Sequence, residues 1–231
     1  MQHRTCLQKE IINMLVKKLF LFSTVALYIS CSNNADTTAE PFDTTLLELP
    51  TEEVAATPEF QSSFASVYTY LKTQDSSFAS TKYELSGNSK LDTSIKNPFK
   101  KEQLQAFYPC FIFNADSSMA IDLYSYNYTI TPAGKLEESG PDTEVGLIDF
   151  TSNTRRRIFF SGPAATIVDA AWQKDGKILL AGAEMIELEK MKPFHLSLDI
   201  NKNQVETFNY NDTLSGNFIN FKNNKCSLLQ L

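Results

Sequence analysis

After Pro109 the sequence breaks into short apolar runs separated by turn-forming residues, and this pattern constrains the fold more than any other feature. Between the runs lie polar stretches rich in Asn, Asp, Ser, Thr and Gly, at residues 114–118, 151–154, 173–176 and 201–204. Such connections are too short for helical crossovers, so neighbouring strands should be antiparallel. Eight strands are predicted: Cys110–Asn114, Met119–Ile130, Val145–Phe150, Arg156–Ser161, Thr166–Trp172, Lys177–Ala183, Phe194–Ile200 and Val205–Tyr210.

The eight strands fall into two groups of four, within residues 110–161 and 166–210. The repeat of about fifty residues, together with the run Trp172–Lys177, resembles blades of a β-propeller. Two blades cannot close a propeller. The expected fold class is therefore mainly β, an antiparallel β-sandwich-like or propeller-remnant body.

One or two helices should precede the strands. Thr57-Pro58-Glu59 is typical of a helix start, and apolar residues then recur at helical spacing, which predicts a helix over about 58–73. A second short helix is expected to begin at Asn97-Pro98 and end before Pro109, with Leu104 and Phe107 facing inward.

The N-terminal segment has the layout of a secretory signal peptide. Lys17-Lys18 form a positive region, Leu19–Ile29 form an apolar region, and Ser30 precedes Cys31. The apolar run is too short to span a bilayer as a helix. Met14 is a better start than Met1, because residues 1–13 add a charged stretch that a signal peptide does not need.

The ending Leu27–Cys31 resembles the lipobox of bacterial lipoproteins, although Tyr28 stands where that family prefers Leu. The resemblance implies cleavage before Cys31 and lipid attachment to its side chain and amine, enough for stable membrane anchoring. Ser32, in place of Asp, implies an outer-membrane location, on the periplasmic side or the surface. The alternative is an ordinary secretory leader with a chance cysteine.

Three parts follow from these features. Residues 1–30 form the signal peptide, and residues 31–56 form the lipidated cysteine and a tether whose polar composition cannot fold alone, although Phe42 and three leucines within residues 46–49 could dock against the body. Residues 57–231 form a single β-rich domain.

The charge of the chain excludes one class of partner. Removing four basic residues and one glutamate with the leader takes the formal charge from −6 to −9, which disfavours nucleic acid. The run Arg155–Arg157 follows a turn composition and is interpreted as a solvated strand start.

Two cysteines remain in the body once Cys31 is lipidated. Cys110 and Cys226 are an even pair in an oxidising compartment, which permits one disulfide. Two buried free thiols are the equal alternative.

Catalytic and metal sites are not expected. His195 shares a strand face with Ser197 and Asp199, but residues two apart on a strand lie about 6.6 Å apart, too far for a nucleophile and its base. We interpret this face as a polar, solvent-facing surface. The run Asp199–Asn203 lacks the later positions of a calcium loop. With no second histidine in the body and no glycine-rich phosphate loop, we expect no cofactor and no transition metal.

Tyr124, Tyr126 and Tyr128 form the candidate binding surface. On one strand they would project to the same face and could bind a glycan or an envelope protein, whereas core packing is the structural alternative.

The sequence thus favours a non-enzymatic binding or envelope-interaction lipoprotein. One alternative is a hydrolase of envelope polymers that uses carboxylates such as Asp122, Asp149 or Asp169. Another is an inhibitor of a secreted enzyme, which would have a protruding loop.

Overall fold

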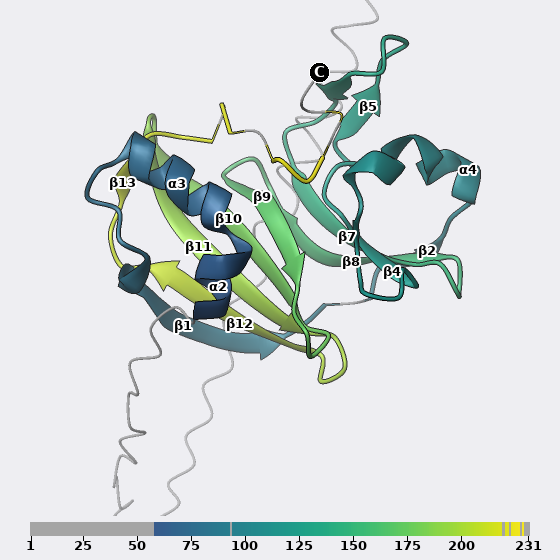
Figure 1. Ribbon diagram of the computed structural model, residues 1–231, viewed down its shortest axis with the longest axis horizontal. Helices are drawn as coiled ribbons and strands as arrows, with labels where there is room; N and C mark the ends of the chain where they lie inside the picture. The colour runs from purple at the N-terminus through teal and green to yellow at the C-terminus, as the bar shows by residue number, and fades with distance from the viewer. Residues whose placement is uncertain (1–57, 93, 219, 222, 227, 229–231) are drawn as a thin grey trace, which may run out of the picture. The chain divides into compact units, whose positions relative to one another are not determined.

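The structure, a computed structural model, describes residues 58–92, 94–218, 220, 221, 223–226 and 228. These residues form a mainly β body of two large antiparallel sheets and one two-stranded hairpin, with short helices on the outer faces of the large sheets (Figure 1). The predicted mainly β, sandwich-like class is confirmed. The predicted signal peptide, Cys31 and the tether over residues 32–56 lie outside the described residues.

The larger sheet has six strands and contains the C-terminal group of predicted strands. Its members are β1 (Tyr83–Lys90), β9 (Ala165–Trp172), β10 (Ile178–Glu187), β11 (Lys190–Asp199), β12 (Gln204–Tyr210) and β13 (Leu214–Ser215). They lie in the order β1-β12-β11-β10-β9, with β13 on one end of β11, and every pair is antiparallel. The tight turn between β9 and β10 requires Gly176, whose φ of 84° suits glycine. β1 was not predicted, because its polar sequence lacks the apolar alternation of a half-buried strand.

The second sheet has five strands and contains the N-terminal group. Its members are β2 (Lys96–Pro98), β3 (Ile112–Phe113), β4 (Met119–Asp122), β7 (Thr143–Asp149) and β8 (Thr154–Ser161). They lie in the order β2-β8-β7-β4-β3 and are all antiparallel. A separate hairpin pairs β5 (Tyr128–Ile130) with β6 (Leu136–Glu138).

The expected continuous strand over Met119–Ile130 is wrong. β4 ends at Asp122, whose carboxylate accepts hydrogen bonds from the amides of Tyr124 and Ser125 at 3.1 and 2.9 Å. A carboxylate that bonds to amides two and three residues ahead offers the backbone a turn in place of the strand ladder. The chain therefore leaves the five-stranded sheet after β4 and forms the separate β5–β6 hairpin.

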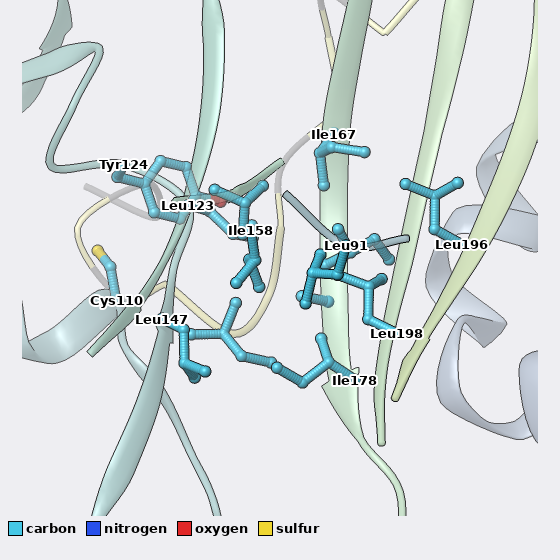
Figure 2. Packing of buried hydrophobic residues seen from close by; sticks show 14 of the residues in the cluster. Leu91, Cys110, Leu123, Tyr124, Leu147, Ile158, Ile167, Ile178, Leu196 and Leu198 are labelled. Atoms are coloured by element: carbon cyan, nitrogen blue, oxygen red, sulfur yellow. The ribbon is translucent and has the colours of Figure 1, made fainter. Parts of the chain in front are cut away.

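The main core lies between the two sheets. In Figure 2, Leu147 and Ile158 of the five-stranded sheet face Ile178 and Leu198 of the six-stranded sheet, and these side chains are at most 5% exposed. The predicted alternation along β11 is confirmed in part, since Phe194, Leu196, Leu198 and Ile200 all belong to this core. The two groups of four strands thus supply the two facing layers of a sandwich.

A second core covers the opposite face of the six-stranded sheet. The helices α2 (Pro58–Ser63) and α3 (Ala65–Gln74) pack there through an apolar stripe that contains Phe60, Phe64 and Leu71, all at most 2% exposed. The predicted helix over about 58–73 is confirmed, with a break at Phe64 between its two parts. None of the helices in the described part of the chain is long and apolar enough to cross a bilayer.

A shorter helical segment covers the outer face of the five-stranded sheet. It consists of α4 (Lys101–Leu104) and the 3-10 helix η2 (Gln105–Cys110), and another 3-10 turn, η1 (Ser80–Lys82), precedes β1. Leu104 and Phe107 face inward as predicted. The expected start at Asn97-Pro98 is wrong, because both residues pair with β8 as part of β2. Proline is tolerated there because β2 is an edge strand.

The C-terminal segment connects the layers across the β9 edge. Phe218 and Phe221 pack on the ring of Tyr70 in α3, at centroid distances of 5.6 and 5.3 Å. Farther along, Cys226 forms a disulfide with Cys110, 116 residues away, at an S–S distance of 2.02 Å. The pairing that the sequence left open is therefore formed.

Candidate functional site

The three tyrosines of the predicted binding surface do not share one exposed face. Tyr124 is 8% exposed and belongs to the main core, Tyr128 is half-buried, and Tyr126 is 46% exposed. The reason is the turn at Asp122, which ends the strand on which the three rings would have shared one face. The rings of Tyr124 and Tyr128 instead contact each other at 5.5 Å.

Tyr126 has a different aromatic partner, Phe160 at the end of β8. Their ring centroids are 6.3 Å apart in an edge-to-face arrangement, and Phe160 is 44% exposed. The guanidinium of Arg157 lies over the Phe160 ring at 4.4 Å from its centroid, a cation–π contact. We call Tyr126, Arg157 and Phe160 the aromatic surface.

A buried charge cluster supports the aromatic surface from below. Arg155 donates from Nε to Asp122 at 2.8 Å and from Nη1 to Glu144, while Arg157 donates from Nε to the other Glu144 oxygen at 2.7 Å. Asp122 and Glu144 are 0% and 5% exposed. Burial alone would lower the pKa of Arg155, but the two carboxylates outweigh it and raise that pKa. Two buried carboxylates and two partly exposed guanidinium groups therefore compensate one another.

The interpretation of Arg155–Arg157 as a solvated strand start is wrong for its first and last members. Arg155 and Arg157 project to the outer face of the five-stranded sheet, where β4 and β7 present the two carboxylates, and Arg156 between them projects to the other face. Arg155 can approach β7 this closely because residue 146 is glycine; a Cβ at this position would collide with the Arg155 guanidinium. Glycine here provides space for a neighbour.

Sequence reasoning missed Glu144 and Phe160. A signal for Glu144 exists: along β7, Val145 and Leu147 are core residues, so Glu144 and Gly146 must share the outer face with the arginines. Adjacent residues of a regular strand project to opposite faces, which likewise predicts that Phe159 and Phe160 do not both enter the same core. Neither signal identifies the partner strand, which is set by the tertiary fold.

The candidate carboxylates of the hydrolase alternative do not face one another. Asp149 accepts hydrogen bonds from Thr151 and Ser152 at the β7–β8 turn, and the bonds from Ser152 lower its pKa. Asp122 is bound to Arg155. Asp169 lies in the other sheet.

Asp169 has an environment of its own beneath the C-terminal segment. It is fully buried on β9, where Oδ1 accepts from Asn223 at 3.1 Å and from Lys225 at 2.9 Å. Burial raises its pKa despite the ammonium of Lys225. Asp169 therefore connects the C-terminal segment to the sheet. Glycoside hydrolysis needs two carboxyl groups that face each other, and Asp122, Asp149 and Asp169 do not form such a pair.

The expectation that His195 lies on a solvent-facing surface is wrong. It is 1% exposed between β11 and the helices, with its ring stacked 4.0 Å from Tyr83 and 4.8 Å from Phe60. The hydroxyl of Tyr68 lies 2.8 Å from Nε2, and burial lowers the pKa of His195 to about 3. Asp199 caps the β11–β12 turn by accepting from the amides of Asn201 and Lys202. A triad with Ser197 is therefore not assembled.

No protein-family model, no curated protein and no solved structure matches this chain. Within the described residues no group of three or more His, Cys, Asp or Glu side chains could hold a metal ion. Among the predicted site residues of the body, Tyr126 is exposed, and with Phe160 it lies on the charged support of Arg155, Arg157 and Glu144.

The charge cluster predicts a large difference between two neighbouring arginines. Arg155→Met keeps much of the side-chain volume but leaves Asp122 and Glu144 without their shared counter-charge, which should cost about 3–5 kcal/mol of unfolding free energy. Arg156→Met, the matched control with no ion pair within the described residues, should change it by only about 0.5 kcal/mol. Urea denaturation measures both. Equal small losses would contradict a buried cluster.

His195 predicts a pH dependence of stability. Its pKa is about 3 in the folded state and about 6.5 when unfolded, so between these values the unfolded chain binds more protons and stability falls as pH falls. His195→Phe should reduce the slope of unfolding free energy against pH by up to about 1.4 kcal/mol per pH unit between pH 4 and 6. Carboxylate contributions cancel in the comparison. Parallel slopes would show that His195 is not buried neutral.

Proposed function

We propose that this protein is an exported lipoprotein, anchored by lipid on Cys31, whose β body binds an envelope glycan or protein through the aromatic surface of Tyr126, Arg157 and Phe160. The leader composition and the lipobox-like Leu27–Cys31 support the anchor. By the same resemblance, Ser32 supports the outer membrane as its location.

The observation that supports binding is the pair of exposed rings, Tyr126 and Phe160, which neighbouring side chains hold in place. Tyr126 and Phe160 each keep nearly half of their surface accessible, and Arg157 is held at Phe160 by its bond to Glu144. Tyrosine and arginine are enriched at binding hot spots, because they combine an apolar contact area with directed hydrogen bonds. A group held in place before binding also loses less entropy on binding.

The hydrolase alternative has weaker support, because its candidate acids are separately occupied by turns and ion pairs. One observation favours a second candidate, the enzyme inhibitor. The β10–β11 hairpin extends beyond β9, whose pairing stops at Glu184, and its tip residue Leu188 is 92% exposed. Leu188→Ser in a binding assay distinguishes a contact at this tip from one at the aromatic surface.

The anchor predicts a defined N-terminus. The mature protein from the native membrane should begin at Cys31 and carry acyl groups there, and Cys31→Ser should abolish both the acylation and the membrane association. Mass spectrometry of the N-terminal peptide decides the matter. An unmodified Cys31, or a mature chain that starts elsewhere, contradicts the lipoprotein assignment.

The aromatic surface predicts a selective loss of binding. In residues 31–231 carrying Cys31→Ser, the further change Tyr126→Ala with Phe160→Ala should weaken binding to a native envelope fraction roughly tenfold or more. Tyr108→Ala is the matched control, since Tyr108 is 50% exposed on η2 and contacts neither ring. Binding is measured by co-sedimentation, and unfolding midpoints confirm the fold. Equal binding by the double variant and the control would contradict a binding role for the aromatic surface.

A further inference from the structure

Asp169 is a buried carboxylate whose two oxygens have unequal surroundings. Oδ1 accepts three hydrogen bonds, from the backbone amide of Ala170 at 2.7 Å, from Asn223 Nδ2 at 3.1 Å and from Lys225 Nζ at 2.9 Å. Oδ2 is buried and has no hydrogen-bond partner within the described residues. An unsatisfied oxygen on a buried carboxylate is costly, and few such atoms occur in folded proteins without a specific reason.

The amine of Lys225 is held beside the carboxyl carbon of Asp169. Cγ lies one covalent bond beyond Oδ1, so a side-chain rotation can bring Nζ to the separation of about 3–3.5 Å from which such groups react. Nζ also donates to the carbonyl of Ala170 at 2.8 Å and lies 5.6 Å from the centre of the buried Phe64 ring. The nucleophile and its target are therefore already neighbours.

The environment of Asp169 favours its protonated form. Burial raises the pKa of this carboxyl although the ammonium of Lys225 opposes the shift. Transfer of one proton from Nζ to the carboxylate gives a neutral amine and a neutral carboxyl group, which is the pair that can react. The transfer also relieves the desolvation that destabilises both charges of a buried ion pair.

Two fixed donors surround the oxygen on which negative charge would develop. When Nζ attacks Cγ, the electron pair of the carbonyl double bond moves to Oδ1, where Ala170 N and Asn223 Nδ2 already donate at 2.7 and 3.1 Å. Donors at these distances stabilise a tetrahedral oxyanion. Asn223 is itself held in place, because its Oδ1 accepts from the amide of Lys225 at 2.9 Å and its Nδ2 also donates to the Val168 carbonyl at 3.0 Å.

We propose that the side chains of Lys225 and Asp169 condense into a covalent amide in the folded protein. The Nζ–Cγ bond forms and the Cγ–Oδ2 bond breaks. Oδ2 leaves as water with two protons, one that Nζ first transferred to the carboxylate and one that Nζ loses as the amide forms. No other reactant is needed. The amide keeps one N–H, both charges disappear, and the oxygen without a hydrogen-bond partner is the atom that leaves.

The fold supplies the driving force that this condensation lacks in dilute solution. Groups held in a reactive geometry behave as if present at about 10⁵–10⁸ M. The side chain of Lys225 is 32% exposed, so the released water has a path out. The amide would close a loop between residues 56 positions apart, beside the Cys110–Cys226 disulfide, and would persist when that disulfide is reduced. It depends neither on the lipid anchor nor on the aromatic surface.

Peptide mapping of the purified protein tests the proposal. After reduction and digestion with trypsin, residues 158–174 and 223–231 should be recovered as one branched peptide, lighter by one water molecule than its two parts together. Trypsin does not cleave after an acylated lysine, so the peptide stays intact at Lys225. We expect this product from most chains. Cleavage after Lys225 together with an unmodified Asp169 in half of the chains or more would overturn the proposal and leave an ordinary ion pair.

Two lysine variants make the comparison specific. Lys225→Arg keeps the positive charge, but a guanidinium that stays protonated is not a nucleophile, so the branched peptide should disappear. Lys177→Arg is the matched control: Lys177 is also 32% exposed and lies 3.4 Å from Asp175, but that carboxylate is 54% exposed. It should leave the yield of branched peptide unchanged. A branched peptide in Lys225→Arg, or its loss in Lys177→Arg, would overturn the assignment. The result for the unaltered protein holds whether or not Lys225→Arg folds.

Discussion

The burial of the central strands of the six-stranded sheet on both faces is the constraint on which the rest of the structure depends. Along β10, Ile178 and Leu180 enter the core between the sheets, while Leu179 and Ala181 enter the core beneath the helices, and all four are fully buried. A strand covered on both faces is expected to be a nearly continuous apolar run. The five-stranded sheet and the helices α2 and α3 are therefore both needed, because either face left open would expose a continuous apolar surface to water.

The polar residues of the body are arranged around this double core. His195 lies within the helix-side core as a neutral ring among aromatic side chains, and Tyr68 satisfies its Nε2. The charged residues Asp122, Glu144, Arg155 and Arg157 lie on the outer face of the other sheet, where they compensate one another. The exposed pair of Tyr126 and Phe160 borders this cluster, so the charge cluster positions two accessible aromatic rings.

The C-terminal segment determines which edge of the sandwich is closed. Lys225 bonds to Asp169 on β9, and the Cys110–Cys226 disulfide attaches the same segment to the start of the five-stranded sheet. The opposite edge strand, β1, has a bulge between Leu85 and Gly87 and ends in Lys90, features that discourage pairing with another chain. The aromatic surface borders β8, away from the disulfide-linked edge.

The sequence by itself determined where most strands and the first helix lie, because the period of apolar residues and the composition of turns are local properties. It did not predict the polar strand β1, because the tertiary fold supplied its partner, β12. β4 ends where the Asp122 carboxylate accepts a hydrogen bond from the backbone amide of Ser125, and the alternation of apolar and polar residues does not reveal this bond. Because the strand ends there, the three tyrosines do not form a row. Burial of Arg155 required carboxylates 33 and 11 residues away, and burial of His195 required a helix 127 residues away. The tertiary structure decided these environments, because the free energy of a charged or polar side chain depends on neighbours that the chain brings together only when it folds.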